Sequence, residues 1–300
     1  MKKMIIIILC VVSIGTLAYC IYYGKEDNST ANTSDDLIVN SNNITNITSE
    51  GEYTVTGESK EIVIDTTGNV VLTLDNVTIN SDKAAIDVVN ADSVIIKLVG
   101  DSYITTNFSG EDKTSSIYSL SNLAIEGEGS ITINSSDDTI KGKKDVIING
   151  GTFKLTAKGD GIHADGKLNI IDGTFDIDGE EGLEATYVKI DGGTINISAT
   201  DDGINASDKS EDYSILFELN GGNITINMAE GDTDGVDSNG NIVINGGYIS
   251  VNGESAFDYD GTATYNGGTI VVNGSITNAI PNQFMGGDPG QGGNPDQRMR

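Results

Sequence analysis

Apolar and polar residues alternate over short stretches throughout residues 49–276, and glycine or asparagine ends most of these stretches. Residues 152–157 are typical, because Phe153 and Leu155 are separated from one another by a polar side chain. Alternation with a period of two indicates β-strands that bury one face. No comparable stretch in this range has the apolar spacing of an amphipathic helix. The pattern therefore predicts an all-β protein.

The alternating stretches belong to a repeated unit. Matching segments are NGGTFKLTA from 149, IDGTFDIDG from 171, DGGTINISA from 191, NGGNITINM from 220, NGGYISVNG from 245 and NGGTIVVNG from 266. Successive units are 20 to 29 residues apart, a spacing typical of repeat architectures. Each unit holds three short alternating stretches separated by turns, which predicts a right-handed parallel β-helix of about ten coils with three strands per coil.

The register of the repeats makes two further structural predictions. One inward column should stack Phe153, Phe175, Ile195, Ile224, Ile249 and Ile270. The corner asparagines should form an amide ladder along the axis, through Asn149, Asn220, Asn245 and Asn266.

The ends of the chain differ from the repeats. Residues 1–24 combine a basic start with an apolar run, which indicates a signal peptide or an N-terminal membrane anchor. Cleavage, lipidation at Cys20 and retention as an anchor all remain open. A polar linker at 25–48 leads to the β-helix domain at 49–276, and a Gly/Pro-rich tail follows at 277–300. We expect an extracellular or cell-surface protein that contacts the membrane only through this first segment.

Charge narrows the partners that the protein can have. The net charge is −28, which disfavours nucleic acid and anionic membranes and favours multivalent cations. Both cysteines, Cys10 and Cys20, lie in the first segment, so the exported part has no disulfide.

One turn recurs with an acid at the same place. It reads GDGIHADG at 159–166, EGLEAT at 181–186, DDGINAS at 201–207 and TDGVDSN at 233–239. The equivalent acids should stack in a column of Asp138, Asp160, Glu181, Asp202 and Asp234. A second column on the surface should hold His163, Glu184, Asn205, Asp237 and Asp258. Like charges about 5 Å apart repel by roughly 3 kcal/mol at an effective dielectric constant of 20. A calcium ion with carboxylate ligands would relieve the repulsion; the alternative is an exposed acidic face screened by salt.

Three segments together resemble a known family. GGTFKLTAKGDGIHADGKLNI, EGLEATYVKIDGGTINISATDDGINAS and IPNQFMGG resemble the exported, calcium-containing parallel β-helix carbohydrate-binding family first described in cellulolytic clostridia. The resemblance implies a non-catalytic protein that binds acidic plant cell-wall polysaccharide (polygalacturonate, or pectin) and also cellulose. It implies Ca²⁺ ligands at Asp160, Glu181, Glu184, Asp201, Asp202, Asn205, Asp234 and Asp237. The chain departs from the family where His163 replaces an oxygen ligand and where AEGDT lengthens the coil before 234.

Two other function classes remain. A pectate-lyase-like enzyme commonly uses an arginine base, but Arg298 and Arg300 lie in the tail and the repeats contain no arginine. Lysines such as Lys158, Lys167 and Lys189 lie near the acids, with nothing to single one out as a base. A structural or adhesive surface solenoid is the second alternative. We expect no enzyme activity and a monomer that binds its polysaccharide through several weak contacts at once.

Overall fold

The computed structural model describes residues 6–9, 21–24, 35–39, 44–109, 114–231 and 233–282. The chain divides into two units, Met1–Asp35 and Asp36–Arg300. In the first, β1 (Ile6–Leu9) and β2 (Ile21–Gly24) form an antiparallel pair. No helix that could cross a membrane occurs among the described residues. Most of the predicted N-terminal segment, linker and tail lies outside the described residues.

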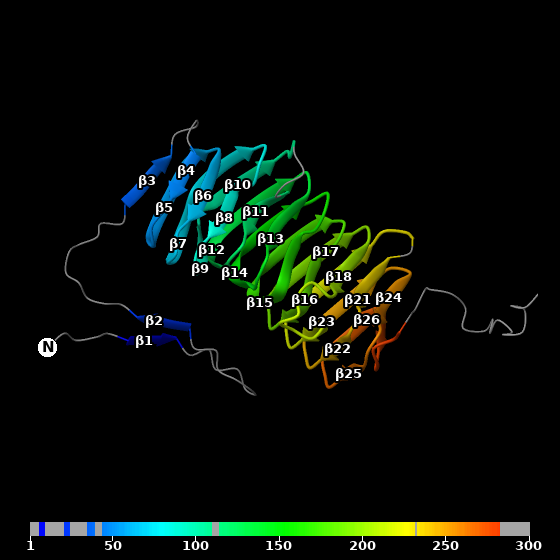
Figure 1. The fold of residues 1–300 in the computed structure, drawn as a ribbon. Helices are drawn as coiled ribbons and strands as arrows, with labels where there is room; N and C mark the ends of the chain where they lie inside the picture. Colours follow the sequence, from blue (N-terminus) through cyan, green and yellow to red (C-terminus); the bar gives the residue numbers. More distant parts are fainter. Residues whose placement is uncertain are drawn as a thin grey trace, which may run out of the picture. The chain divides into compact units, whose positions relative to one another are not determined.

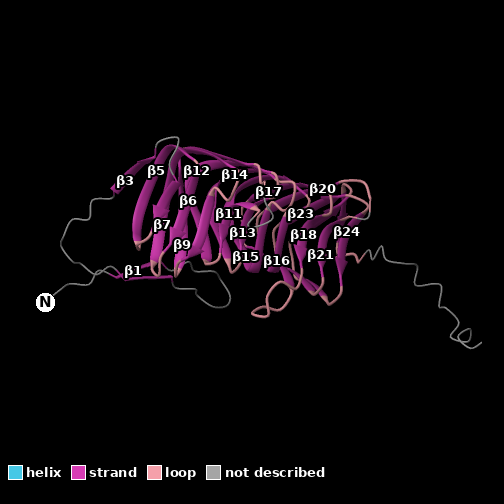
Figure 2. Cartoon of the chain, turned by 45° about the horizontal axis from the view of Figure 1, so that its top comes forward, coloured by secondary structure: helices cyan, strands magenta, loops and turns pink. Residues whose placement is uncertain are grey.

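The second unit is a parallel β-helix, as predicted. Its strands stack turn upon turn for about nine turns, and the described residues form strands and turns without any helix (Figures 1 and 2). Each strand pairs in parallel with the strand one turn later; β15, for example, pairs with both β16 and β17. Several strands continue round a corner, so that the 18-residue β15 contributes to all three faces.

The strands group into three faces. The first holds β4 (Ile44–Ile47), β6 (Glu61–Asp65), β8 (Ile86–Asn90), β11 (Ser115–Ser119), β13 (Asp138–Gly142), the start of β15 (Ile162–Gly179) and of β16 (Leu183–Ile190), β18 (Asp202–Ala206), β21 (Asp234–Ser238) and β24 (Ser255–Tyr259). The second holds parts of β5 (Gly51–Ser59), β7 (Asn69–Ser81), β12 (Asn122–Ser135), β14 (Val146–Thr156), β15 and β16, with β9 (Ser93–Val99), β19 (Leu216–Leu219), β22 (Asn241–Ile244) and β25 (Ala263–Tyr265). The third holds the ends of β5, β7, β12, β14 and β15, with β10 (Asp101–Thr106), β17 (Thr194–Ala199), β20 (Asn223–Met228), β23 (Tyr248–Asn252) and β26 (Thr269–Val272). β27 (Ser275–Thr277) folds back antiparallel on β26, and β3 spans Asp35–Val39.

The core confirms the predicted inward column. Its six side chains are fully buried and lie in register from Phe153 to Ile270. The rings of Phe153 and Phe175 are stacked, with centroids 4.7 Å apart and planes 5° apart. Alternation along each strand therefore places the apolar side chains inside the coil and leaves the polar ones on its faces.

The corner ladder is present over three coils. Asn245 Nδ2 donates to Asn220 Oδ1 at 2.8 Å, and Asn266 Nδ2 donates to Asn245 Oδ1 at 2.7 Å. Asn220 in turn donates to Asp191 Oδ1 at 2.8 Å. The predicted ladder is wrong at Asn149, because its register partner on the next coil is Asp172.

Candidate functional site

The recurring turn aligns its polar side chains in the two predicted columns. Asp202 pairs in register with Asp234. In the second column, Lys141 pairs with His163, which is followed by Glu184, Asn205 and Asp237 on successive coils. A parallel stack thus repeats the same turn on the same face, and neighbouring acids are brought within one strand spacing of about 4.8 Å.

Glycine between the two columns allows the coils to approach this closely. A Cβ at Gly182 would lie 2.4 Å from the carbonyl oxygen of Gly203 and 2.5 Å from Cγ2 of Ile197. No real Cβ fits at such distances, so the core isoleucine takes the space that a side chain would need. In each Asp-Gly or Glu-Gly pair the fold therefore requires the glycine, while the acid before it remains available to a ligand.

The acids form two overlapping groups that could hold a metal ion. Ligand atoms of Asp160, Glu181 and Glu184 lie within 4.8 Å of one another, as do those of Glu181, Asp201 and Asp202. Glu181 belongs to both groups. A third group contains Asp138, Asp160 and His163.

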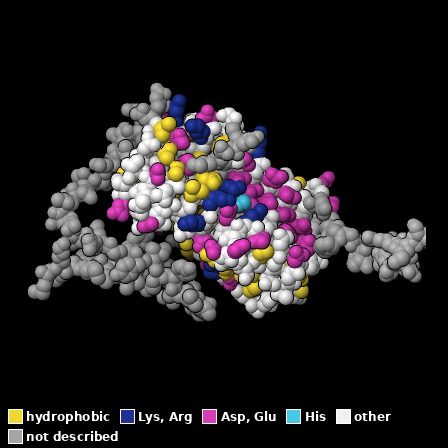
Figure 3. All heavy atoms as spheres, viewed as in Figure 1, with side chains coloured by type: hydrophobic (Ala, Val, Ile, Leu, Met, Phe, Trp, Pro, Cys, Tyr) yellow, Lys and Arg dark blue, Asp and Glu magenta, His cyan; other side chains and the backbone are white. Residues whose placement is uncertain are grey.

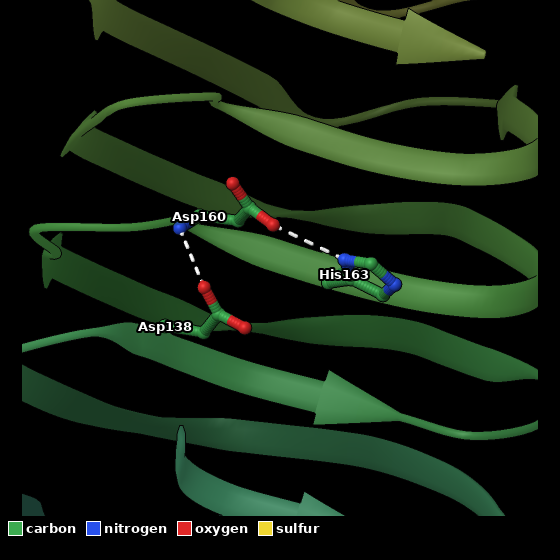
Figure 4. Close-up of side chains that lie close together, drawn as sticks. All are labelled: Asp138, Asp160 and His163. Carbon is green, nitrogen blue, oxygen red and sulfur yellow. Dashed lines mark hydrogen bonds and ion pairs between the residues drawn. The ribbon is translucent and has the colours of Figure 1, made fainter. Parts of the chain in front are cut away.

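At the N-terminal end of the columns, basic side chains of the protein itself neutralise the acids. His163 Nδ1 lies 3.1 Å from Asp160 Oδ2, and its Nε2 lies 3.1 Å from Asp165 Oδ1 (Figure 4 shows the first contact). His163 Nδ1 also forms an ion pair with Glu184. Asp138 Oδ1 accepts the backbone N–H of Asp160 at 2.8 Å (Figure 4).

Three lysines complete this group. Lys141 Nζ lies 2.7 Å from Asp138 Oδ2, Lys143 Nζ 2.5 Å from Asp165 Oδ2, and Lys209 Nζ 2.5 Å from Glu184 Oε1. Lys209 comes from the long coil that follows β18, and this segment folds back onto the preceding coil. In Figure 3, dark blue side chains gather beside the cyan histidine, and magenta side chains extend from there toward the C-terminal coils.

The predicted surface position of His163 is wrong. The side chains of His163 and Glu184 are only 7% and 5% exposed, since the flanking aspartates and Lys209 enclose them. Burial opposes the charged form of each. Hydrogen bonds from His163 to Asp160 and then to Glu184 nevertheless raise the pKa of His163 to about 9, and the hydrogen bond with His163 lowers the pKa of Glu184 to about 2. The ion pair is therefore charged at neutral pH.

Farther along the columns, the acids lack such partners. Among the described residues, no ion pair joins a basic side chain to Glu181, Asp202 or Asp237. Burial, followed by repulsion from neighbouring acids, raises the pKa of Glu181 to about 8, of Asp202 to about 7 and of Asp237 to about 6. The ionised forms of these three acids therefore have no basic partner in the described part of the chain.

Two buried oxygens beside these acids have no hydrogen-bond donor. Asn205 Nδ2 donates to Glu181 Oε1 at 3.0 Å, which leaves Asn205 Oδ1 and Glu181 Oε2 without a partner among the described residues. A buried acceptor without a donor costs about 1–3 kcal/mol. Two such acceptors beside Asp201 and Asp202 fit the oxygen set that a hard divalent cation requires.

The remaining predicted ligands lie at the edge of this arrangement. Asp234 accepts a hydrogen bond from Ser255 Oγ, and its backbone N–H donates to Asp202 Oδ1 at 3.3 Å. Neither Asp234 nor Asp237 belongs to a group of three close ligand atoms in the described residues. Lys209 could not be predicted as a partner of Glu184, because nothing in the sequence shows that its coil folds back.

The comparisons agree with this architecture. The chain belongs to a family described as carbohydrate-binding domain-containing protein, whose profile matches residues 41–279. A similar solved structure is the polysaccharide lyase-like protein from C. thermocellum, in a gadolinium derivative. It has 25% sequence identity and a TM-score of 0.55, and the match covers 75% of this chain and 89% of that one. None of the curated proteins matches this chain.

Proposed function

We propose that the protein is an extracellular, non-catalytic binder of acidic plant polysaccharide of the polygalacturonate type, with Ca²⁺ held by its acidic turns. The observation that carries the proposal is the pair of buried, unpartnered oxygens of Glu181 and Asn205 beside Asp201 and Asp202. The family match supports a carbohydrate partner. Cellulose is a further partner that the sequence resemblance implies.

The residues fit calcium better than they fit a softer metal. Glu181, Asp201, Asp202 and Asn205 offer only oxygen atoms, and Ca²⁺ takes six to eight oxygens at about 2.3–2.6 Å. The similar solved structure is a gadolinium derivative, and gadolinium is also a hard cation that prefers oxygen. Asp234 and Asp237 extend the acidic columns by one coil and would hold a further ion there.

The ion-paired end of the columns should contribute less to metal binding. Asp160 and Glu184 already contact His163, and Glu184 contacts Lys209 as well. A metal ion at this end would have to displace these charged contacts. We therefore place the principal ion between the coils of Glu181 and Asp202.

Charge explains why a cation is needed for this substrate class. Polygalacturonate is a polyanion, and a chain of net charge −28 repels it. A bound calcium ion offers coordination positions to uronate carboxylates and so turns repulsion into attraction. The acidic turn recurs on successive coils, so calcium ions held at Glu181, Asp202 and Asp234 can bind several uronates at once. Several weak contacts of this kind raise avidity without a deep pocket.

A lyase is the second candidate function, since the similar structure is called polysaccharide lyase-like. The ion-paired state of His163, Lys141 and Lys209 argues against each of these three as its base, because a cation held by carboxylates is a poor base. A structural solenoid would require neither the unpartnered oxygens nor a carbohydrate.

The experiment compares polygalacturonate binding in excess calcium and in excess chelator. We expect binding to weaken by about a hundredfold or more in chelator, with an unchanged far-UV spectrum. Equal binding in both conditions would rule out calcium bridging. An increase in ultraviolet absorbance from unsaturated uronates would assign the protein to the lyases.

A further inference from the structure

A second polar surface lies one corner beyond the acidic columns, on the outer side of β15, β16 and β19. It consists of Lys167, Asn169, Tyr187, Lys189 and Tyr213, and we call it the tyrosine–lysine patch. Lys167 is in register with Tyr187, and Asn169 with Lys189. All five side chains are half-buried.

Three residues of the patch have their polar groups satisfied within the chain. Lys189 Nζ lies 2.7 Å from Asp191 Oδ2, and the hydroxyl of Tyr187 donates to Glu218. Tyr213 is held at the patch from the long coil after β18, since its hydroxyl donates to Asp145 Oδ2 at 2.7 Å. The ring centroids of Tyr187 and Tyr213 are 6.1 Å apart and their planes are 59° apart.

The other two residues each have a polar group that no ion pair or hydrogen bond in the described residues satisfies. Lys167 Nζ lies 4.4 Å from the ring centroid of Tyr187, and no carboxylate in the described residues is within ion-pair distance of it. Asn169 Oδ1 is buried and accepts no hydrogen bond from the described residues. A half-buried lysine without an acid is unexpected in a chain with 45 acidic residues and only 17 basic ones. An anionic ligand that also donates hydrogen bonds would satisfy both residues.

We propose that the tyrosine–lysine patch is a metal-independent subsite for one hexuronate residue of the polysaccharide. The Lys167 ammonium group binds the uronate carboxylate, and a sugar hydroxyl donates to Asn169 Oδ1. The ring of Tyr213 packs against the apolar C–H face of the sugar, in the way that aromatic side chains combine an apolar body with a polar tip. The inference rests on the substrate class proposed above and adds a site that requires no calcium.

The position of the patch suits a ligand that also reaches the acidic columns. Glu184 and Tyr187 are three residues apart on β16, so the two surfaces adjoin on the same coil. The segment that supplies Tyr213 also supplies Lys209 to Glu184, so one long coil contributes to both surfaces. A polysaccharide chain crossing this corner would meet calcium on one side and the lysine on the other.

The test titrates the full chain with trigalacturonate and with its methyl ester, in excess chelator, by calorimetry. We expect the free acid to bind about tenfold more tightly than the ester, as one charge-assisted hydrogen bond would give. Lys167→Met should abolish this preference, and Lys167→Arg should retain it. Lys154→Met is the matched control, because Lys154 is an exposed lysine on a different face.

Several outcomes would overturn the inference. One is a wild-type chain that binds the free acid no more tightly than the ester. Another is the same acid preference in Lys167→Met and in Lys154→Met. A third is Lys167-dependent binding of poly-L-glutamate as tight as that of trigalacturonate, which would indicate an acidic peptide as the ligand. The calcium proposal is tested separately. If it alone fails, polygalacturonate binds equally well in calcium and in chelator, while the preference for the free acid remains and depends on Lys167. If the patch alone fails, Lys167→Met keeps full calcium-dependent binding of polygalacturonate, and the preference for the free acid is absent.

Discussion

The side-chain amide of Asn205 donates to Glu181 Oε1 at 3.0 Å, and this one bond leaves the second oxygen of each side chain buried without a donor. The two residues lie on adjacent coils, because Glu184 and Asn205 are in register. The bond therefore fixes two acceptor oxygens next to Asp202, whose own pKa burial raises to about 7. This is the site to which we assign the proposed cation.

Replacing the two central carboxylates should remove calcium binding while leaving the fold intact. Glu181→Gln combined with Asp202→Asn takes away two charged ligands and also relieves repulsion between buried acids. We expect calcium affinity to fall by at least about tenfold. Binding of polygalacturonate in calcium should fall with it, and the chelated protein should melt at a higher temperature than wild type.

Asp176→Asn provides the control for that double variant, since Asp176 is an exposed acid on another face. It changes the net charge by one unit without touching the acidic columns. Calorimetric titration with calcium measures all the variants. A double variant that binds calcium as tightly as Asp176→Asn would show that the ion lies elsewhere.

The stability of the calcium-free protein should fall as pH rises. In the folded state the pKa of Glu181 is about 8, above its ordinary value of 4.5, and that of Asp202 is about 7, above 3.8. The folded chain then holds more protons than the unfolded chain between about pH 4 and 8, so the free energy of unfolding decreases across that range. His163, with its pKa raised from 6.5 to about 9, acts in the same direction at higher pH.

Thermal melting in chelator at about pH 5, 6.5 and 8 measures this effect. The melting temperature should decline steadily with pH. Calcium favours the ionised carboxylates, so it should stabilise the protein more at pH 8 than at pH 5. A melting temperature in chelator that rises from pH 5 to pH 8 would contradict the raised pKa values.

The glycine between the two columns should tolerate no side chain. Gly182→Ala would place a Cβ 2.4 Å from the carbonyl oxygen of Gly203 on the next coil. The coils must then separate or Ile197 must shift, and overpacking of this kind costs about 1–3 kcal/mol. Urea denaturation measures the change. Thr194→Ala, at an exposed position, is the control, and equal stability of the two variants would contradict the close contact.

Residues that repeat were predictable, and residues that do not repeat were not. The period-two alternation placed Phe153 and Phe175 in one inward column, because stacking of parallel coils leaves no other register. The acidic columns followed from the same spacing. Lys209 and Tyr213 lie in the long segment between β18 and β19. This segment folds back over the preceding coils, where Lys209 contacts Glu184 and Tyr213 contacts Asp145. No local sequence pattern predicts these contacts. The burial of His163 was missed for the same reason.

His163→Ala should affect the two ends of the acidic columns differently. The variant loses contacts with Asp160, Asp165 and Glu184. Glu184 keeps Lys209 and Asp165 keeps Lys143, but Asp160 is left without a counter-ion among the described residues. Loss of one partner of a buried ion pair costs about 3 kcal/mol or more, so the chelated protein should be clearly destabilised.

Calcium should restore part of that loss, because oxygens of Asp160, Glu181 and Glu184 lie within 4.8 Å of one another and no imidazolium then neutralises them. The stabilisation by calcium should therefore be larger in His163→Ala than in wild type, while polygalacturonate binding in saturating calcium changes little. Melting temperatures with and without calcium measure both parts. Equal calcium stabilisation of the two proteins would mean that His163 does not keep a cation out of this group of acids.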